Sequence, residues 1–289
     1  MMIVELLAIS AAFFYGLSGV LVRKGLISDP ESSPLSAVFI TMLTQFIVMW
    51  GLYIFSSPPF HLQALLVFAL AGIIAQCIGR TMNYQGISKL GVSKNNTIVG
   101  TNPLFSVLIA TIFLGEVFTP PIYAGIILII LGVIIIIQKK GANKVEKGKN
   151  WLLIFPLTAA MCYGVNTNIR KIGLNMLPSP IAGSTFAVSA ALGVYILLLC
   201  LSKKIRNISL NIRNIYFLGS GLSICIAWIC SFSALTMGKV TIVSPIQGTS
   251  PLFMLISSKI FLKTEKITYK IAIGALAVVS GVILISMFK

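Results

Sequence analysis

The sequence predicts an all-α polytopic membrane protein with ten transmembrane helices, arranged as two five-helix repeats of opposite orientation. Three observations predict this fold. The 289-residue chain is 57% hydrophobic and only 10% charged, whereas soluble domains carry roughly 25% charged residues. Apolar runs long enough to cross a bilayer recur along the chain, and the first half of the sequence recurs in the second half. This composition excludes a water-soluble enzyme, a secreted disulfide scaffold and a disordered chain.

The apolar runs are separated by short polar breaks rich in helix-ending residues, of which Ser57-Pro58-Pro59 is one. Within lipid each run must be helical, because a spanning segment has to satisfy its own backbone hydrogen bonds. A helical crossing needs about 20 residues. We therefore expect spans near 3–24, 34–55, 64–88, 92–115, 120–138, 152–174, 181–201, 212–237, 240–262 and 267–287.

The charge distribution favours a membrane protein over a nucleic-acid-binding one. The chain carries 22 Lys and Arg against 6 Asp and Glu, a net charge of +16. Most basic residues lie in short loops beside apolar runs, where they anchor the chain to anionic lipid headgroups and set its topology. Nucleic acid is therefore not an expected partner. The five cysteines lie inside apolar runs without a CxxC pair, so we expect no disulfide, metal or other cofactor.

An internal repeat defines the expected domains. At an offset of 148 residues, Tyr15-Gly16 falls on Tyr163-Gly164, and further matches follow at the same offset. Each half then holds five spans. Because five is odd, the second half must enter the membrane from the opposite side, a construction common in secondary transporters. We expect a first repeat over 1–138, a basic linker over 139–151 and a second repeat over 152–289.

The repeated segments resemble a known transporter family. The expected fourth span reads GTNPLFSVLIATIFLGE at 100–116, and the ninth repeats it as GTSPLFMLISSKIFLKTE at 248–265, where LGE has become LKTE. Ten helices in two repeats with these segments resemble the drug/metabolite transporter superfamily, most closely its EamA-type branch. The resemblance covers essentially the whole chain and implies a secondary transporter. It carries little information about the substrate.

Two prolines deep in the repeated segments predict helix bends. Pro103 and Pro251 each remove one amide donor and clash with the preceding turn, which frees carbonyl groups there. One interpretation is a pair of symmetry-related bends that line a central cavity, where Thr101 and Asn102 supply polar contacts. The other is simple kink geometry, with the hydroxyl groups bonded back to their own helix. Both interpretations fit the sequence.

The third span carries a polar face suited to substrate binding. Gln76, Arg80 and Asn83 are spaced by four and three residues, which places them on one side of a helix. A charged residue inside a span usually faces a bundle interior or an aqueous cavity. The repeat equivalent of Arg80 is Trp228, which is a further binding candidate. The repeat therefore does not require an arginine at this position, and Arg80 is a candidate anchor for a carboxylate or phosphate. The alternatives are snorkelling towards an interface and pairing with carbonyl groups of a neighbouring helix.

Polar residues on other spans complete the expected lining. Tyr163 and Asn166 share a face of the sixth span with Arg170, and Tyr15 lies at the matching depth of the first span. We take Tyr15, Tyr163, Asn166 and Gln247 as binding candidates. The alternative is that each tyrosine hydroxyl bonds between helices, beside a glycine that allows close packing.

The positions of the acidic residues restrict the substrate class. All six lie at span ends or in loops. The small multidrug relatives in the superfamily use a glutamate within the first helix to exchange protons for cationic drugs, and residues 11–19 contain no acid. We therefore expect a neutral, zwitterionic or anionic metabolite, with amino acids and organic acids first and export favoured. It would cross by alternating access through a cavity between the repeats.

Three other functions compete with a carrier. A lipid or polyprenyl-phosphate flippase is the main alternative, because Arg80 would equally meet a headgroup phosphate. A channel would differ from a carrier by its single-channel current. A membrane enzyme has little support, because the sequence contains no HExxH motif, His61 is its only histidine, and no two acids share a span.

The expected location is the cell (plasma) membrane, with orientation set by the basic loops. Most Lys and Arg follow the odd-numbered spans, and five lysines lie in the linker 139–151. The positive-inside rule places these loops in the cytoplasm and both termini outside, whereas ten-helix relatives are expected to have cytoplasmic termini. A monomer and a homodimer are both compatible with the sequence.

Overall fold

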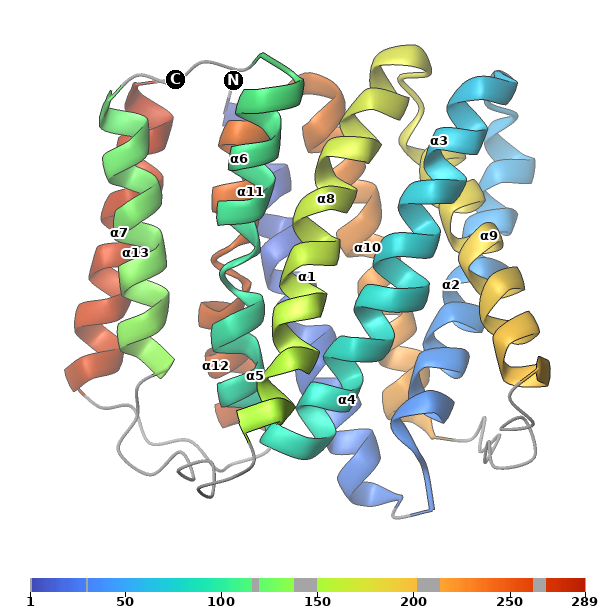
Figure 1. The fold of residues 1–289 in the computed structure, drawn as a ribbon, viewed down its shortest axis with the longest axis horizontal. Helices are drawn as coiled ribbons and strands as arrows, with labels where there is room; N and C mark the ends of the chain where they lie inside the picture. The colour runs from blue at the N-terminus through green and yellow to red at the C-terminus, as the bar shows by residue number, and fades with distance from the viewer. Residues whose placement is uncertain are drawn as a thin grey trace.

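The structure, a computed structural model, is a bundle of helices whose axes lie roughly parallel to one another, some running up and others down (Figure 1). It describes residues 2–29, 31–115, 120–137, 150–201, 214–261 and 269–288. Helices occupy all ten apolar runs that the sequence predicts, within a few residues at each end, and the fourth and ninth runs each contain a break. Most of the expected basic linker 139–151 lies outside the described residues.

Within the described residues, the first repeat contains seven α-helices and one π-helical stretch. Its helices begin where local chemistry satisfies free amides: the Ser33 side chain accepts a hydrogen bond from the Ser36 amide, and Pro34 occupies the first turn. The elements are α1 (Met2–Ser28), α2 (Pro34–Ser56), α3 (Leu62–Gly72), η1 (Ile73–Gly79), α4 (Arg80–Leu90), α5 (Val92–Val99), α6 (Asn102–Phe113) and α7 (Pro120–Ile137).

The second repeat follows the same order. Helix α10 (Ile215–Met237), in the eighth span, is capped by Asn214, whose side chain accepts a hydrogen bond from the Tyr216 amide. The elements are the short 3₁₀ turn η2 (Asn150–Leu153), α8 (Ile154–Met176), α9 (Pro180–Leu201), α10 (Ile215–Met237), α11 (Val240–Gln247), α12 (Ser250–Phe261) and α13 (Tyr269–Met287).

Seven helical segments in the described part of the chain are long and apolar enough to cross a membrane: Met2–Ser28, Pro34–Ser56, Leu62–Leu90, Trp151–Met176, Pro180–Leu201, Ile215–Met237 and Val240–Phe261. Two shorter apolar helices, Asn102–Phe113 and Pro120–Gly132, accompany them. The protein is therefore a multi-pass membrane protein. The count of ten crossings stays a prediction.

The helices pack with a two-fold pattern that relates the two repeats. Helix α1 packs on α10 and α12, and its equivalent α8 packs on α3 and α6. In the same way α2 packs on α10, and α9 packs on α3. Helices α1 and α8 run in opposite directions, and α7 pairs with α13 at one edge of the bundle (Figure 1). This exchange of partners fits two repeats of opposite orientation.

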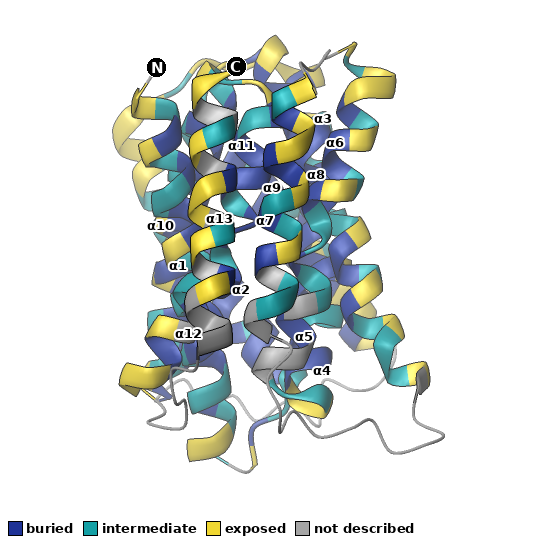
Figure 2. Cartoon of the chain, turned by 90° about the vertical axis from the view of Figure 1, so that its left-hand side faces the viewer, coloured by how far each residue is buried: buried dark blue, intermediate teal, exposed yellow. Residues whose placement is uncertain are grey.

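The outward sides of the helices are apolar and exposed. Figure 2 views the bundle over α7 and α13 and shows exposed residues along the outer faces, with buried residues behind them. Large aliphatic side chains are among those exposed, including Leu66, Leu70, Leu108, Ile112 and Leu276. In water such a surface would be unfavourable, whereas in hydrocarbon it costs nothing.

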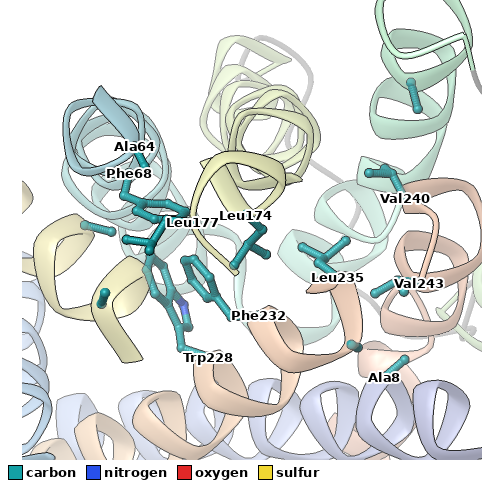
Figure 3. Packing of buried hydrophobic residues seen from close by; sticks show 14 of the residues in the cluster. Ala8, Ala64, Phe68, Leu174, Leu177, Trp228, Phe232, Leu235, Val240 and Val243 are labelled. Carbon is teal, nitrogen blue, oxygen red and sulfur yellow. The ribbon is translucent and has the colours of Figure 1, made fainter. Parts of the chain in front are cut away.

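An aromatic cluster of Phe68, Trp228 and Phe232 joins α3 to α10 (Figure 3). The ring centroids of Phe68 and Phe232 lie 5.9 Å apart, and those of Trp228 and Phe232 lie 5.4 Å apart. Gly173 and Gly183 leave room for these rings, because a Cβ at either position would collide with them. The cluster packs α3 against α10 with apolar contacts.

Candidate functional site

A cavity of about 140 Å³ lies between the two repeats. Its lining comes from α1, η1, α4 and α5 of the first repeat and from α8, α10, α11 and α12 of the second, together with Asn102 at the start of α6. Trp228 belongs both to this lining and to the aromatic cluster. The aromatic cluster therefore reaches the cavity through Trp228, and most of the other lining residues have polar side chains.

Nine of the ten predicted binding residues line this cavity: Tyr15, Gln76, Arg80, Asn83, Asn102, Tyr163, Asn166, Trp228 and Gln247. The tenth, Thr101, is not part of the lining. Its hydroxyl donates to the carbonyl of Ile98 at 2.6 Å, which is the local bonding that the sequence left as an alternative. Of the two predicted bend residues, Pro251 lines the cavity and Pro103 does not.

The fourth and ninth runs are broken before their prolines. At the first break the Thr101 amide donates to the carbonyl of Ile98, and at the second the Thr249 amide donates to that of Ile246, each at 3.1 Å. Pro103 and Pro251 consequently sit in the first turn of α6 and α12, where a missing amide donor costs little. The prolines start new helices instead of bending continuous ones.

The first break borders the cavity, and the second break lies against the start of α6. Gly100 and Val99 line the cavity at the first break, and the Asn102 side-chain amide donates to the Val99 carbonyl at 3.0 Å. A Cβ on Gly248 would lie 2.5 Å from Cγ of Pro103. Non-helical backbone at membrane depth is tolerated where it lines a cavity, as in transporters with broken helices.

The repeated Tyr-Gly pairs hold the broken segments close to the first helix of each repeat. A Cβ on Gly16 would lie 2.7 Å from the Met254 amide nitrogen and the Ser250 carbonyl oxygen of α12. A Cβ on Gly164 would lie 2.9 Å from the Ser106 amide nitrogen of α6. Ser106 is the repeat equivalent of Met254, so both glycines perform the same packing role. The neighbouring tyrosines line the cavity.

A π-helical stretch leads directly into Arg80. The Arg80 amide donates to the carbonyl of Ala75, five residues back, and Gly79 packs against the ring of Tyr163. Single π-helical turns of this kind are frequent at functional sites. The stretch brings both Gln76 and Arg80 to the cavity wall.

Arg80 is buried and held by amide side chains. It is only 4% exposed, and its Nη2 donates to Oε1 of Gln45 at 2.9 Å. Gln76 Nε2 donates to the same oxygen, also at 2.9 Å. Nη1 of Arg80 has no hydrogen-bond partner within the described ranges. Arg80 thus stays inside the bundle with one donor pair unused, instead of reaching an interface.

A second buried arginine, Arg170, lies in the same cavity. It is 3% exposed, and its Nη2 donates to the Ser231 hydroxyl at 3.0 Å. The same hydroxyl oxygen accepts from Gln247 Nε2 at 2.9 Å. The guanidinium carbon lies 3.8 Å from the ring centroid of Phe232 and 4.9 Å from that of Trp228, within the range of cation–π attraction. Its helical spacing from Tyr163 and Asn166 was the available signal in the sequence.

Further polar contacts lie beside the cavity on α5. Asn95 Nδ2 donates to Asn83 Oδ1 at 2.5 Å and to Asn96 Oδ1 at 3.1 Å. Asn96 Nδ2 donates to the sulfur of Met254 on α12, which links the two repeats. Asn96 and Met254 both line the cavity. Sequence reasoning selected neither, and nothing in their spacing distinguished them.

The charge of the cavity is one-sided. The lining contains two arginines, and none of the lining residues that the structure describes is Asp or Glu. A buried cation without a counter-ion is costly, by several kcal/mol per charge. The cavity is therefore suited to a bound group that supplies negative charge.

Comparison with known proteins decides the family. The model of the EamA-like transporter family matches residues 2–138 and 150–287. The chain belongs to the EamA-like transporter family. This confirms the family identified from the repeated segments, and it makes the protein a membrane transporter of that type.

Relatives of this EamA-family protein include other transporters. An uncharacterized transporter of Archaeoglobus fulgidus is 25% identical over 97% of this chain and 96% of its own length. A triose phosphate/phosphate translocator of Brassica oleracea and a phosphoenolpyruvate/phosphate translocator of Arabidopsis thaliana, both chloroplastic, are each 24% identical over 83% and 84% of this chain. The chain spans 61% and 60% of these two plant proteins.

The fold of the EamA-family chain also matches a solved structure. A protein crystal structure superimposes with a TM-score of 0.70, covering 96% of this chain and 97% of that one at 13% identity. At this identity the likeness shows the shared fold alone.

Proposed function

We propose that this EamA-family protein is a secondary transporter that moves a small anionic metabolite across the membrane by alternating access. The observation that carries the proposal is the pair of buried arginines, Arg80 and Arg170, in a cavity whose described lining contains no acid. Carboxylate and phosphate groups are the anions that guanidinium groups bind best, through charge-assisted hydrogen bonds. An organic acid or a phosphate ester is thus the preferred substrate class.

The charge balance favours an anion over an amino acid. A zwitterion would bring an ammonium group next to two guanidinium groups, and no described lining residue offers it a carboxylate. A doubly charged anion would neutralise both arginines in a site of low dielectric, where uncompensated charge costs most. The names of the two plant relatives, which are phosphate translocators, support a phosphate-bearing substrate at low identity.

In this proposal the chain crosses the bilayer ten times. The α5–α6 pair and the α11–α12 pair each make one broken crossing, and α7 and α13 add one crossing each. This count is supported by the ends of the chain, since α1 begins and α13 ends at the same end of the bundle (Figure 1). An even number of crossings is required for that arrangement.

In this proposal, alternating access uses two equivalent walls of the cavity, one from each repeat. Trp228 of the aromatic cluster lines the cavity in the second repeat. At the repeat offset Trp228 and Phe232 correspond to Arg80 and Tyr84 on α4, both in the cavity lining. The two walls would take turns in closing as the third and fourth spans (α3–α4 and α5–α6) rock against the eighth and ninth spans (α10 and α11–α12). Export from the cytoplasm across the plasma membrane is the direction we assign.

Counterflow in liposomes tests the proposal. Purified protein is reconstituted into vesicles loaded with unlabelled succinate or inorganic phosphate, and uptake of the same labelled compound is measured, with lactate, alanine and glucose as comparisons. We expect saturable counterflow of the divalent anions that is absent from protein-free vesicles. Counterflow confined to alanine or glucose would contradict an anion site. A fluorescent lipid in the same vesicles, lost from one leaflet only with protein present, would support the flippase alternative instead.

A further inference from the structure

Gln45 on α2 lies directly behind Arg80 and is fully buried, but it is not among the residues that line the cavity. Resting on the proposed function, we infer that Gln45 is a positioning residue that orients the Arg80 guanidinium without neutralising it, and so sets the preference of the site for doubly charged anions. No sequence pattern pointed to Gln45, a polar residue in a largely apolar run.

The geometry fixes the orientation of the Gln45 amide. Its Oε1 accepts two hydrogen bonds, from Arg80 Nη2 and from Gln76 Nε2, each at 2.9 Å. An amide oxygen has two lone pairs, so both are used. The reverse orientation would turn the Gln45 NH₂ group towards two other donors, which is unfavourable. The oxygen therefore holds one side of the guanidinium and leaves Arg80 Nη1 without a partner among the described residues.

The support for Arg80 is a neutral dipole instead of a carboxylate. An amide oxygen satisfies a guanidinium N–H and leaves the positive charge of the arginine uncompensated. A carboxylate at the same place would form a buried ion pair and remove most of the attraction for an incoming anion. Gln45 thus supplies geometry without supplying charge. Nη1 of Arg80, buried and without a partner among the described residues, is the donor that this inference assigns to a substrate oxygen.

Packing keeps the turn that carries Gln45 in place. On the same stretch of α2, the hydroxyl of Thr41 donates to the Ala37 carbonyl at 2.8 Å, and that of Thr44 donates to the Ile40 carbonyl at 2.8 Å. Gly221 of α10 packs closely there, because a Cβ on it would lie 2.6 Å from Cβ of Thr44. The positioning residue therefore rests on a rigid element, as precise binding geometry requires.

The second repeat lacks this arrangement. At the offset of 148 residues Gln45, Gln76 and Arg80 correspond to Gly193, Ile224 and Trp228. The fold is therefore built without the three polar groups at the equivalent place. A unit that occurs once in a two-fold scaffold points to the site and not to packing as its reason.

The test compares two substitutions that keep the shape of Gln45 with one control. Gln45→Glu supplies a carboxylate, and Gln45→Met removes the acceptor without adding charge. Gln63→Glu, at an exposed position in the first turn of α3, makes the same charge change away from the cavity. Each protein is reconstituted, and counterflow of succinate, inorganic phosphate and the monocarboxylate lactate gives KM and maximal rate for each probe. Thermal unfolding in detergent is measured in parallel.

For Gln45→Glu we expect KM for succinate and phosphate to rise about tenfold to hundredfold, the range of a lost charge-assisted hydrogen bond, with the maximal rate near that of the wild type. The preference for succinate over lactate should fall by a similar factor. Gln45→Met should raise KM for all probes alike and leave that preference unchanged. Gln63→Glu should match the wild type. A merely structural role of Gln45 would change both variants in the same way.

The outcomes separate the inference from the proposed function. Wild-type counterflow of succinate or phosphate, together with an unchanged KM and preference in Gln45→Glu, would overturn the role of Gln45 alone. Wild-type protein that moves none of the anions would overturn the proposed function and this inference with it. If Gln45→Glu does not accumulate in the membrane, Gln45→Met carries the test, and a KM equal to that of the wild type for every probe would overturn the role of Gln45.

Discussion

The paired glycines Gly16 and Gly164 allow a stability prediction that the structure makes quantitative. Gly16→Ala would place a Cβ 2.7 Å from the Met254 amide nitrogen and the Ser250 carbonyl oxygen, both backbone atoms of α12. Gly164→Ala would place one 2.6 Å from Cβ of Phe105 on α6. Ordinary contacts of this kind begin near 3.4 Å. Each broken segment would therefore have to move by about 0.7 Å, in an interior that is already close-packed.

The expected cost follows from two opposing effects. Overpacking of a close-packed interior costs about 1–3 kcal/mol, and replacing a mid-helix glycine by alanine returns roughly 0.5–1 kcal/mol of helix propensity. Each variant should lose about 1–2 kcal/mol. For a chain of this size the midpoint of thermal unfolding should fall by about 2–6 °C. The two sites share no partner residue, so the losses should add in the double variant.

Thermal unfolding of purified protein in detergent measures this effect, and the chain supplies its own controls. At Gly51 on α2 and Gly193 on α9, no heavy atom lies within 4 Å of the place that a Cβ would take, so neither alanine would meet a neighbour. Gly51→Ala and Gly193→Ala should leave the midpoint unchanged or raise it. An unchanged midpoint for Gly16→Ala and Gly164→Ala, or an equal fall in all four variants, would refute the packing argument.

Three further predictions concern the site and the topology. Arg80→Ala should reduce uptake of divalent anions about tenfold or more, with normal amounts of protein in the membrane; normal uptake would remove its assigned role. Arg170→Lys should raise KM for the same anions, because lysine loses the planar stacking on Trp228 and Phe232, and equal KM values would show that the stacking is unimportant for binding. A reporter fused to the C-terminus should score as extracellular, as the basic loops predict, and a cytoplasmic score would reverse the orientation.

Much of the fold follows from two simple properties of the sequence. Bilayer thickness fixes the length of a crossing, so apolar runs alone placed the helices within a few residues. The repeat then fixed which helices correspond, because Tyr15-Gly16 and Tyr163-Gly164 recur where both glycines must pack against a broken segment. Helical spacing predicted that Gln76 and Asn83 share one wall, because this prediction requires only that both lie in the same continuous helical span.

Other features depend on partners that are distant in sequence. The π-helical stretch before Arg80 leaves no mark in the pattern of residues. Gln45 is selected by two hydrogen bonds to residues more than thirty positions away, so its role appears only once α2 lies beside α4. The sequence predicted bends at Pro103 and Pro251 but did not distinguish a kink from a new helix, because a proline is equally compatible with a kink and with the first turn of a helix.

The distribution of residues between the repeats separates scaffold from site. Glycines that let helices approach occur in both repeats, at Gly16 and Gly164, because the two-fold packing needs them twice. The arginines occur once each, with Trp228 opposite Arg80 and Val22 opposite Arg170 at the repeat offset. A symmetric pair of walls is what alternating access requires, whereas a bound metabolite need not share the two-fold symmetry of the walls. Asymmetric charge on a symmetric scaffold satisfies both requirements, because substitutions in one repeat tune binding and leave the packing of the other intact.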